Sequence, residues 1–344
     1  MNGKDDGHGA YPIIYGDDTY QLSPSKEGYI SGVVKAADTS QVLKNAPVDL
    51  YKDNKLIASA KTDSNGNYKI KAVHGNYQLA IAFTGYKYFT SNVSVVTNRT
   101  TYVENVLLVE DTDAQGTATG KITNALTGTN IEGVTMQIRS GWNVTEGEIV
   151  KTIQSNNQGM YSVTLPVGYY TVSMSKDGYV ASVLNIYISK NTAENQNGVM
   201  NPIGSTDTYR IVLQWGENPG DLDSHVIGKL SNQSNFHVYY NNRNVMDGNS
   251  KVASLDVDDT NGFGNETITL IPTTDAPYSY YVYKYAGTGE LIDSNAQVKL
   301  YKGNQLIKVY NVPVTGSGRY WNVFTLTNEQ MQDVNLISND AMRQ

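Results

Sequence analysis

The sequence predicts an all-β protein built from three tandem β-sandwich domains. Glycine (31 residues) and tyrosine (26 residues) are abundant beside threonine, valine and asparagine, which is the mixture of strands joined by tight turns. Short segments of alternating polar and apolar residues recur along the chain, while helical periodicity is absent. A length of 344 residues allows two or three domains, each with its own core.

Part of the chain also repeats at a fixed offset. A turn with glycine before a tyrosine, followed by two further glycine-tyrosine elements, returns with each glycine displaced by 93 residues. A unit of this length is too long for a solenoid repeat and suits a small β-sandwich, so we expect a string of such domains. The paired glycines are Gly66 and Gly159, Gly75 and Gly168, and Gly85 and Gly178.

The repeat and the changes in composition predict the domain boundaries. Residues 1–26 are polar and rich in glycine and aspartate, as expected of a tail or linker. Two sandwich domains follow at 27–110 and 116–202, separated by a short polar linker. A third domain with a different pattern covers 206–330, and residues 331–344 are expected to form a C-terminal tail.

In the first domain, alternating residues between turn signals such as Asp63–Asn67 predict short strands. One further strand-like patch, Tyr11–Tyr15, lies in the tail. The predicted strands are Tyr29–Lys35, Ala46–Tyr51, Leu56–Thr62, Tyr68–Val73, Tyr77–Phe83, Phe89–Val96 and Thr101–Val109.

The second domain follows the same plan, with extra length in a loop at Ser140–Glu148 that carries Trp142. In the third domain, runs of β-branched and aromatic residues predict strands again. The second-domain strands are Thr117–Asn124, Gly133–Arg139, Ile149–Gln154, Tyr161–Leu165, Tyr170–Ser175 and Val180–Ile188. The third-domain strands include Tyr209–Trp215, Tyr278–Tyr285, Ala296–Tyr301, Gln305–Tyr310 and Trp321–Leu326.

The two repeats resemble the carboxypeptidase regulatory-like (transthyretin-like) family of bacterial sandwich domains. The resemblance implies an Ig-like or transthyretin-like β-sandwich that serves mostly as a spacer or stalk. The residues that carry it in the first copy are Ser31–Val33, Ala46–Val48, Asp63–Tyr68, Gly75–Tyr77 and Gly85–Tyr86. In the second copy they are Gly120–Ile122, Glu132–Val134, Gly159–Tyr161, Gly168–Tyr170 and Lys176–Tyr179.

The third domain resembles the YfaP-like family of bacterial exported β-sandwich domains over residues 207–326. Its signature runs from Trp215-Gly216 through Asp-Leu-Asp-x-His at 221–225 to Leu-Asp-Val-Asp-Asp at 255–259, and ends in Glu-Thr-Ile at 266–268. Asn265 stands where many relatives carry proline. This resemblance implies an exported sandwich domain and no particular activity.

Acidic residues in this domain suggest a cation site. In extended strands, Asp221, Asp223 and His225 share one face, and Asp256 and Asp258 share another. Like charges this close repel unless they are separated, hydrogen-bonded or neutralised. Calcium binds through carboxylate, carbonyl and amide oxygens, and a glycine-punctuated loop with Asp258, Asp259, Asn261 and Glu266 could wrap such an ion. The predicted ligands are Asp221, Asp223, Asp256, Asp258 and Asp259.

Two other interpretations of these carboxylates stay open. Aspartate in turns accepts hydrogen bonds from backbone N–H groups, so the residues could have a purely structural role. Paired carboxylates can also hydrolyse glycosides, which requires a cleft and a defined separation.

Aromatic residues form a second candidate site. Tyr281, Tyr283 and Tyr285 alternate along one strand, so they share a face that could stack against sugar rings. Trp142, in the inserted loop of the second domain, is a further candidate for ligand binding. The alternative is that these residues are ordinary edge-strand aromatics of a tyrosine-rich protein.

Composition and missing motifs narrow the function. A net charge of −7 disfavours nucleic-acid binding, and the absence of cysteine excludes disulfides and thiolate sites. No apolar stretch is long enough for a membrane span. No nucleophile elbow, phosphate loop or zinc-protease motif is present, so we expect the chain not to be an enzyme. Calcium is the one cofactor that the sequence suggests.

We therefore expect a non-catalytic segment of a bacterial cell-surface or secreted, extracellular protein, acting as a monomer or as part of a longer chain. The repeats would form a stalk, and the third domain a distal adhesive or structural head that contacts another protein or a glycan. The alternative is a carbohydrate-binding accessory module of a glycan-degrading protein or complex.

Overall fold

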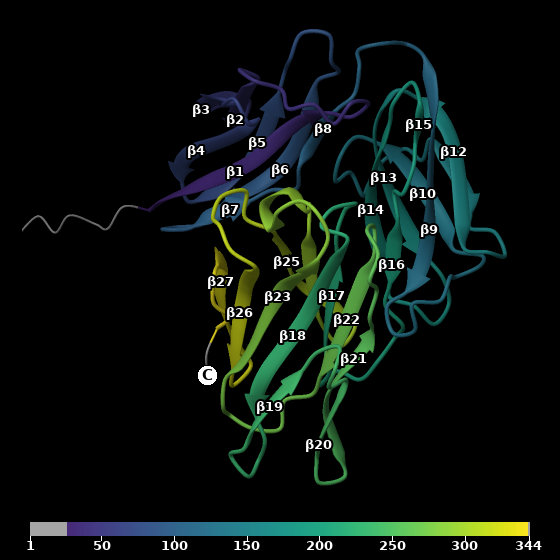
Figure 1. Cartoon of the computed structure of the whole chain (residues 1–344). Helices are drawn as coiled ribbons and strands as arrows, with labels where there is room; N and C mark the ends of the chain where they lie inside the picture. Colours follow the sequence, from purple (N-terminus) through teal and green to yellow (C-terminus); the bar gives the residue numbers. More distant parts are fainter. Residues whose placement is uncertain (1–25, 343–344) are drawn as a thin grey trace, which may run out of the picture.

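The computed structural model describes residues 26–342, and these form strands with a single 3-10 turn at Leu291–Asp293. The predicted all-β fold of three tandem sandwiches is confirmed (Figure 1). The strand-like patch Tyr11–Tyr15 lies outside the described residues.

In the first domain, two four-stranded sheets pack face to face. The first half of β1 pairs in parallel with β7 and its second half with β8, while β4 pairs with it antiparallel. The second sheet has the order β3-β2-β5-β6. The strands are β1 (Glu27–Ala36), β2 (Pro47–Lys52), β3 (Lys55–Lys61), β4 (Asn67–Val73), β5 (Gly75–Ile81), β6 (Phe89–Val95), β7 (Thr100–Tyr102) and β8 (Val106–Leu108).

The second domain repeats this topology strand for strand. Its central strand β9 pairs with β12, β15 and β16 as β1 pairs with β4, β7 and β8, and the other sheet has the order β11-β10-β13-β14. The strands are β9 (Gln115–Asn124), β10 (Thr135–Ser140), β11 (Lys151–Gln154), β12 (Met160–Pro166), β13 (Gly168–Ser175), β14 (Ser182–Ile188), β15 (Thr192–Ala193) and β16 (Gly198–Met200).

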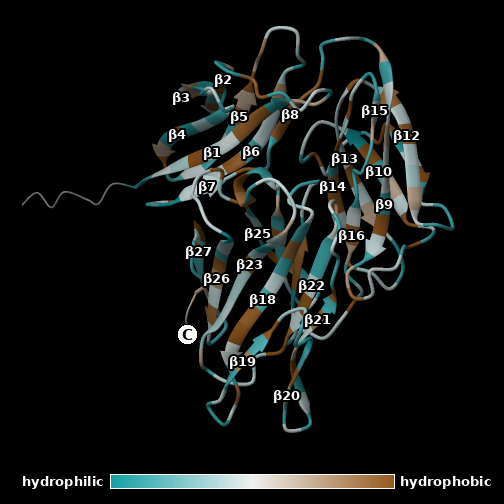
Figure 2. Ribbon diagram, in the orientation of Figure 1, coloured by the Kyte–Doolittle hydropathy of each residue, from teal (hydrophilic) through white to brown (hydrophobic). Residues whose placement is uncertain are grey.

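Alternation of polar and apolar residues explains why these segments form sandwiches. Along β12, buried and exposed residues alternate one by one, which places one side of the strand in the core and the other in water. Figure 2 shows the resulting mixture of apolar and polar residues along the strands. The repeated glycines Gly66 and Gly159 have φ angles of 75° and 69°, which residues with a Cβ rarely adopt.

The third domain is larger and packs a six-stranded sheet, β20-β21-β22-β17-β24-β25, on a five-stranded sheet, β19-β18-β23-β26-β27. Its strands are β17 (Tyr209–Gln214), β18 (Asp221–Lys229), β19 (Asn235–Val238), β20 (Asn244–Asp247), β21 (Ser250–Val257), β22 (Asn265–Leu270), β23 (Tyr278–Ala286), β24 (Gln297–Lys302), β25 (Gln305–Asn311), β26 (Tyr320–Thr327) and β27 (Gln330–Ser338).

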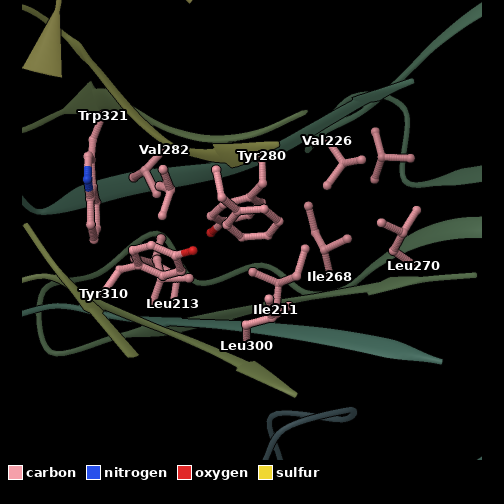
Figure 3. Close-up of a cluster of buried hydrophobic side chains, with 14 of the residues drawn as sticks. Ile211, Leu213, Val226, Ile268, Leu270, Tyr280, Val282, Leu300, Tyr310 and Trp321 are labelled. Carbon is pink, nitrogen blue, oxygen red and sulfur yellow. The ribbon is translucent and has the colours of Figure 1, made fainter. Parts of the chain in front are cut away.

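Large apolar side chains from both sheets fill the space between them (Figure 3). Trp321 and Tyr280 from the five-stranded sheet and Ile211 and Leu300 from the six-stranded sheet belong to this cluster, and all four are almost completely buried. The expectation of a C-terminal tail from residue 331 is wrong, because β27 continues the five-stranded sheet and Ile337 joins this core. Its alternating polar and apolar residues carry the signal of an edge strand.

The third domain contacts both of the others, so the three domains do not form a linear string (Figure 1). Arg99 of the first domain pairs with Asp333 of the third. Ala125 of the second domain packs against Val212 and Tyr301 of the third. The first two domains meet where the backbone N–H of Val109 donates a hydrogen bond to the Tyr169 hydroxyl (3.1 Å).

Candidate functional site

Three carboxylates from different strands meet at one end of the third domain. Asp223 lies in β18, Glu266 in β22, and Asp258 directly follows β21. One carboxylate oxygen from each lies within 4.8 Å of the others. Two of the predicted ligands, Asp223 and Asp258, are therefore brought together. Glu266, which sequence reasoning placed only in the neighbouring loop, completes the group.

The pairing of β18 explains why Glu266 reaches this point. β18 pairs with β23 along its length, but β19 pairs with it only from Val226 onward. The backbone N–H of Ser224 is therefore free of the sheet ladder. It donates a hydrogen bond to Glu266 Oε2 (2.5 Å), which reaches across from the six-stranded sheet. Glu266 is 0% exposed, so its carboxyl group is enclosed between the two sheets.

Several oxygens of this group and of the neighbouring Asp221 have no hydrogen-bond donor among the described residues. They are Asp221 Oδ1, Asp223 Oδ2 and Glu266 Oε1, all buried. One cationic side chain pairs with the group at its surface: Arg243 Nη1 lies 3.5 Å from Asp258 Oδ2. Negative charge thus exceeds positive charge at a partly dry site, which is unfavourable unless protons or a cation compensate it.

The pKa values reflect this environment. Burial, together with the charges of Asp221 and Asp258, raises the pKa of Asp223 to about 7. Burial and the adjacent Asp258 carboxyl raise the pKa of Glu266 well above its ordinary value. Burial also raises the pKa of Asp221, and the negative charges of Asp258 and Asp259 raise it further. The group therefore holds protons near neutral pH when no cation is bound.

The loop that carries Asp258 and Asp259 folds back on itself. Asp259 Oδ1 accepts a hydrogen bond from the backbone N–H of Asn261 (3.2 Å). Gly264 lies so close to the Asp259 carboxyl group that a Cβ there would come within 2.8 Å of its Cγ. Phe263 has a φ of 58°, a left-handed conformation that closes the turn. Asp259 is therefore held by its own loop, and its negative charge is near enough to raise the pKa of Asp221.

Asp256 does not join the group, so the predicted pairing of Asp256 with Asp258 on one strand face is wrong. A β-bulge between Leu255 and Val257 interrupts the alternation on which that prediction relied, and β21 ends before Asp258. The Asp256 carboxylate instead accepts hydrogen bonds from Ser254 Oγ (2.7 Å) and from Thr269 Oγ1. For Asp256, the structural interpretation of the aspartates applies.

A cluster of histidine and tyrosine rings covers the outer face of the five-stranded sheet. His225 stacks on Tyr281 (ring centroids 4.7 Å apart) and on Tyr239 (5.6 Å). Its Nδ1 lies 2.8 Å from His237 Nε2, so the two rings share a hydrogen bond. Burial, with a contribution from His237, lowers the pKa of His225 to about 3. His225 is therefore neutral and is held as part of the cluster.

The three tyrosines predicted to share a face differ in exposure, and the pairing of β18 with β23 passes over Tyr285. Tyr281 is 5% exposed beneath its neighbours, Tyr283 is half-buried, and Tyr285 is 47% exposed. Tyr283 packs on Tyr320 (4.9 Å between centroids), and Tyr285 on Tyr240 (5.4 Å). Sequence reasoning missed Tyr320 and could not place the aromatic pair Tyr239-Tyr240 beside β23, because the local sequence does not determine which strands pair.

Trp142 lies far along the chain from these tyrosines and packs elsewhere. Its ring contacts Phe89 of the first domain (5.7 Å) and Tyr169 of the second (6.2 Å), both edge to face. It also lines a cavity of about 730 Å³ to which all three domains contribute, together with Glu104 and Lys299. Trp142 therefore belongs to a domain boundary, and the structure does not bring it to the tyrosine face.

No helix among the described residues is long and apolar enough to cross a membrane. The family described as "Carboxypeptidase regulatory-like domain" matches residues 18–109. Among curated proteins, Bacillopeptidase F of Bacillus subtilis (strain 168) is 25% identical over 166 residues, which is 48% of this chain and 11% of that protein. The match thus spans a small part of that relative's length.

Solved structures match this chain at low similarity. "The Bacillus anthracis TIE protein" covers 85% of this chain and 49% of its own, with 14% identity and a TM-score of 0.23. A streptococcal ancillary pilin covers 52% and 63%, with 14% identity and a TM-score of 0.21. The shaft pilin SpaA from Lactobacillus rhamnosus GG covers 53% and 99%, with 14% identity and a TM-score of 0.21. The family match supports a carboxypeptidase regulatory-like domain at residues 18–109, the family that the first repeat resembles.

Proposed function

We propose that this chain is a non-catalytic scaffold segment of a bacterial cell-surface or secreted protein, whose third domain contacts a partner protein or glycan. The observation that carries the proposal is that polar contacts join all three domains at their boundaries. Lys190 Nζ pairs with Glu110 Oε1 (2.6 Å), and Asn311 Nδ2 donates to the Tyr102 carbonyl (3.1 Å). Such contacts hold domains in one arrangement, which suits a scaffold.

The carboxylate group supports a non-catalytic role. Glycoside hydrolysis by two carboxylates requires an open cleft in which a sugar lies between them. Asp223 and Glu266 are 4% and 0% exposed. None of the grouped carboxylates lines the cavity between the domains. The match to Bacillopeptidase F over 11% of that protein also supports an accessory segment of a larger chain.

Proteolytic shaving of intact source cells tests the proposed location. Peptides from this chain are expected in the supernatant while the cells remain intact, since an external scaffold is accessible to protease. Detection of its peptides only after cell lysis would contradict a surface location. Recovery from the culture medium without protease would identify the secreted form.

The exposed tyrosines favour carbohydrate binding as a second candidate function. Tyr240 and Tyr285 are exposed side by side, and Tyr283 and Tyr320 form a half-buried platform next to them. Sugar rings stack on such aromatic surfaces through their apolar faces. A glycan array is expected to show binding that Tyr283→Ala and Tyr285→Ala weaken. Tyr88→Ala is the matched control, because Tyr88 is an exposed tyrosine of the first domain. The absence of binding to any glycan would exclude this function.

A further inference from the structure

The carboxylate group of the third domain has the composition of a hard-cation site. Its ligand atoms are oxygens from Asp223, Asp258 and Glu266, and Asp221 and Asp259 are near enough to affect the charge of the group. Among the described residues, no histidine nitrogen joins this group of ligand atoms, and the chain contains no cysteine. Zinc prefers nitrogen and sulfur ligands, whereas calcium and magnesium prefer oxygen.

The buried oxygens provide an independent sign that a ligand belongs here. Glu266 is 0% exposed and Asp223 is 4% exposed, yet Glu266 Oε1 and Asp223 Oδ2 have no donor among the described residues. Buried carboxylate oxygens are normally satisfied, because leaving one unpaired is costly. Both unpaired oxygens belong to side chains that meet at Asp258. A bound cation would satisfy them together.

The spacing of the oxygens fits one ion. Calcium is coordinated at 2.3–2.6 Å, so two oxygens on opposite sides of the ion lie about 4.6–5.2 Å apart and the others lie closer. The three ligand oxygens are all within 4.8 Å of one another, which matches a single coordination sphere. The sphere needs further oxygens, which Asp221, the 258–264 loop and water can supply.

We propose that Asp223, Asp258 and Glu266 bind one calcium ion, which fixes the 258–264 loop against the second domain. The loop and the two residues that flank it, Val257 and Asn265, already contact that domain. Asn197 Nδ2 donates a long hydrogen bond to the Phe263 carbonyl (3.4 Å), and Thr123 Oγ1 donates to Asn265 Oδ1 (3.4 Å). Val257, at the start of the loop, lies beside Gly128 of the second domain. An ion that holds the loop therefore stabilises the boundary between the two domains.

Calorimetric titration of the whole chain tests the site directly. The protein is first treated with EDTA and dialysed, then titrated with calcium chloride alone. One ion is expected to bind per chain, with a dissociation constant between about 10⁻⁵ and 10⁻³ M, the range of weaker sensor and extracellular calcium sites. Asp258→Asn is expected to weaken binding at least about tenfold, because it removes one ligand charge. The absence of binding in the unaltered chain would overturn the proposal.

Controls separate the site from general charge effects. Asp256→Asn removes a carboxylate two positions from Asp258 that binds Ser254 and Thr269 instead, so it should leave the calcium affinity unchanged. If Asp256→Asn weakened binding as much as Asp258→Asn, the assigned ligands would be wrong.

Glu266→Gln is expected to abolish binding. Asp258 lies nearer the surface, so Asp258→Asn carries the test if the Glu266 variant does not fold. Magnesium chloride that binds more tightly than calcium would contradict the choice of ion.

Hydrogen exchange tests the link to the domain boundary. Amide exchange in residues 258–264 is expected to slow on addition of calcium to the unaltered chain, and not in Asp258→Asn. Unchanged exchange in this loop at saturating calcium would show that the ion does not fix it, and would overturn that part of the proposal.

Discussion

Arg99 of the first domain and Asp333 of the third form an ion pair, with 3.0 Å between Nη1 and Oδ2, although 234 positions separate them in the chain. Asp333 also accepts hydrogen bonds from Lys308 Nζ (2.5 Å) and from the Tyr310 hydroxyl (2.7 Å). One half-buried carboxylate on β27 thus connects the edge of the third domain to the first domain. The strand β27, expected from the sequence to be a tail, therefore carries the ion pair between the third domain and the first.

Replacement of Asp333 is expected to destabilise the protein. Asp333→Ala leaves Lys308, Tyr310 and Arg99 without their shared acceptor, and a charged hydrogen-bonding group of this kind contributes about 2 kcal/mol. Urea unfolding measures the change in the free energy of unfolding. Glu329→Ala is the matched control, because the Glu329 carboxylate is exposed and its surface ion pair with Lys302 is expected to contribute little to stability. Equal effects of the two substitutions would show that the Asp333 contacts do not hold in solution.

The same carboxylate predicts a dependence on acid pH. Burial alone would raise the pKa of Asp333, but hydrogen bonds from Lys308 and Tyr310 and the charges of Lys308 and Arg99 hold it below its ordinary value. The folded pKa is thus lower than the unfolded one. The stabilisation is present above the unfolded pKa of about 4 and is lost as the pH falls through the folded pKa. The stability difference between the unaltered chain and Asp333→Asn should shrink below about pH 4. A constant difference down to pH 2 would contradict this.

Most strands can be predicted from the sequence because alternation and turn residues are signals contained in short segments. Alternation between turns locates β1 to β6 within a few residues, and the fixed offset predicts that the second domain copies the first. The last strand of the first domain is different. Thr101–Val109 is predicted as one strand, but it forms β7 and β8, because residues 103–105 pass between two separate parallel pairings with β1. Parallel pairing with a distant strand leaves no local signature.

The candidate sites show the same limit. The predicted alternation of Asp221 and Asp223 is interrupted, because the register of β18 on β23 shifts between Asp221 and Leu222. Asp256 is misplaced since a bulge depends on the partner strand and not on its own residues. Glu266 could not be placed with Asp223, because only the packing of one sheet on the other brings β22 to β18. The position of Trp142 likewise depends on how two domains meet.

Removal of calcium is expected to reveal the protonation of Asp223. Its pKa is about 7 in the folded protein and about 3.9 in the unfolded protein. Between about pH 4 and pH 7, Asp223 is therefore protonated in the folded protein and ionised in the unfolded one. The contribution of protonated Asp223 to the free energy of unfolding is fully present below about pH 4 and is lost as the pH rises to about 7. In EDTA at pH 7, Asp223→Asn should therefore be more stable than the unaltered chain, by roughly 1–3 kcal/mol. With excess calcium the order should reverse.

Thermal melts of both proteins at pH 4 and pH 7, with EDTA or calcium, measure this reversal. At pH 4 in EDTA the two proteins should melt at similar temperatures, because Asp223 is then protonated in the folded state. An Asp223→Asn variant that is less stable under all four conditions would show that Asp223 has a structural role independent of charge.

Trp142 offers a test of whether its loop serves the domain boundary or a ligand. Its edge-to-face contacts with Phe89 and Tyr169 join the first two domains. The Tyr169 hydroxyl also accepts a hydrogen bond from the backbone N–H of Val109 at the same boundary. Loss of a half-buried tryptophan is expected to cost about 2 kcal/mol, below the 3–5 kcal/mol of a fully buried one. Trp142→Ala should thus lower the free energy of unfolding, Trp142→Phe should retain part of it, and exposed Tyr88→Ala should have little effect. If Trp142→Ala left stability unchanged and abolished binding to a glycan, Trp142 would be a ligand-binding residue instead.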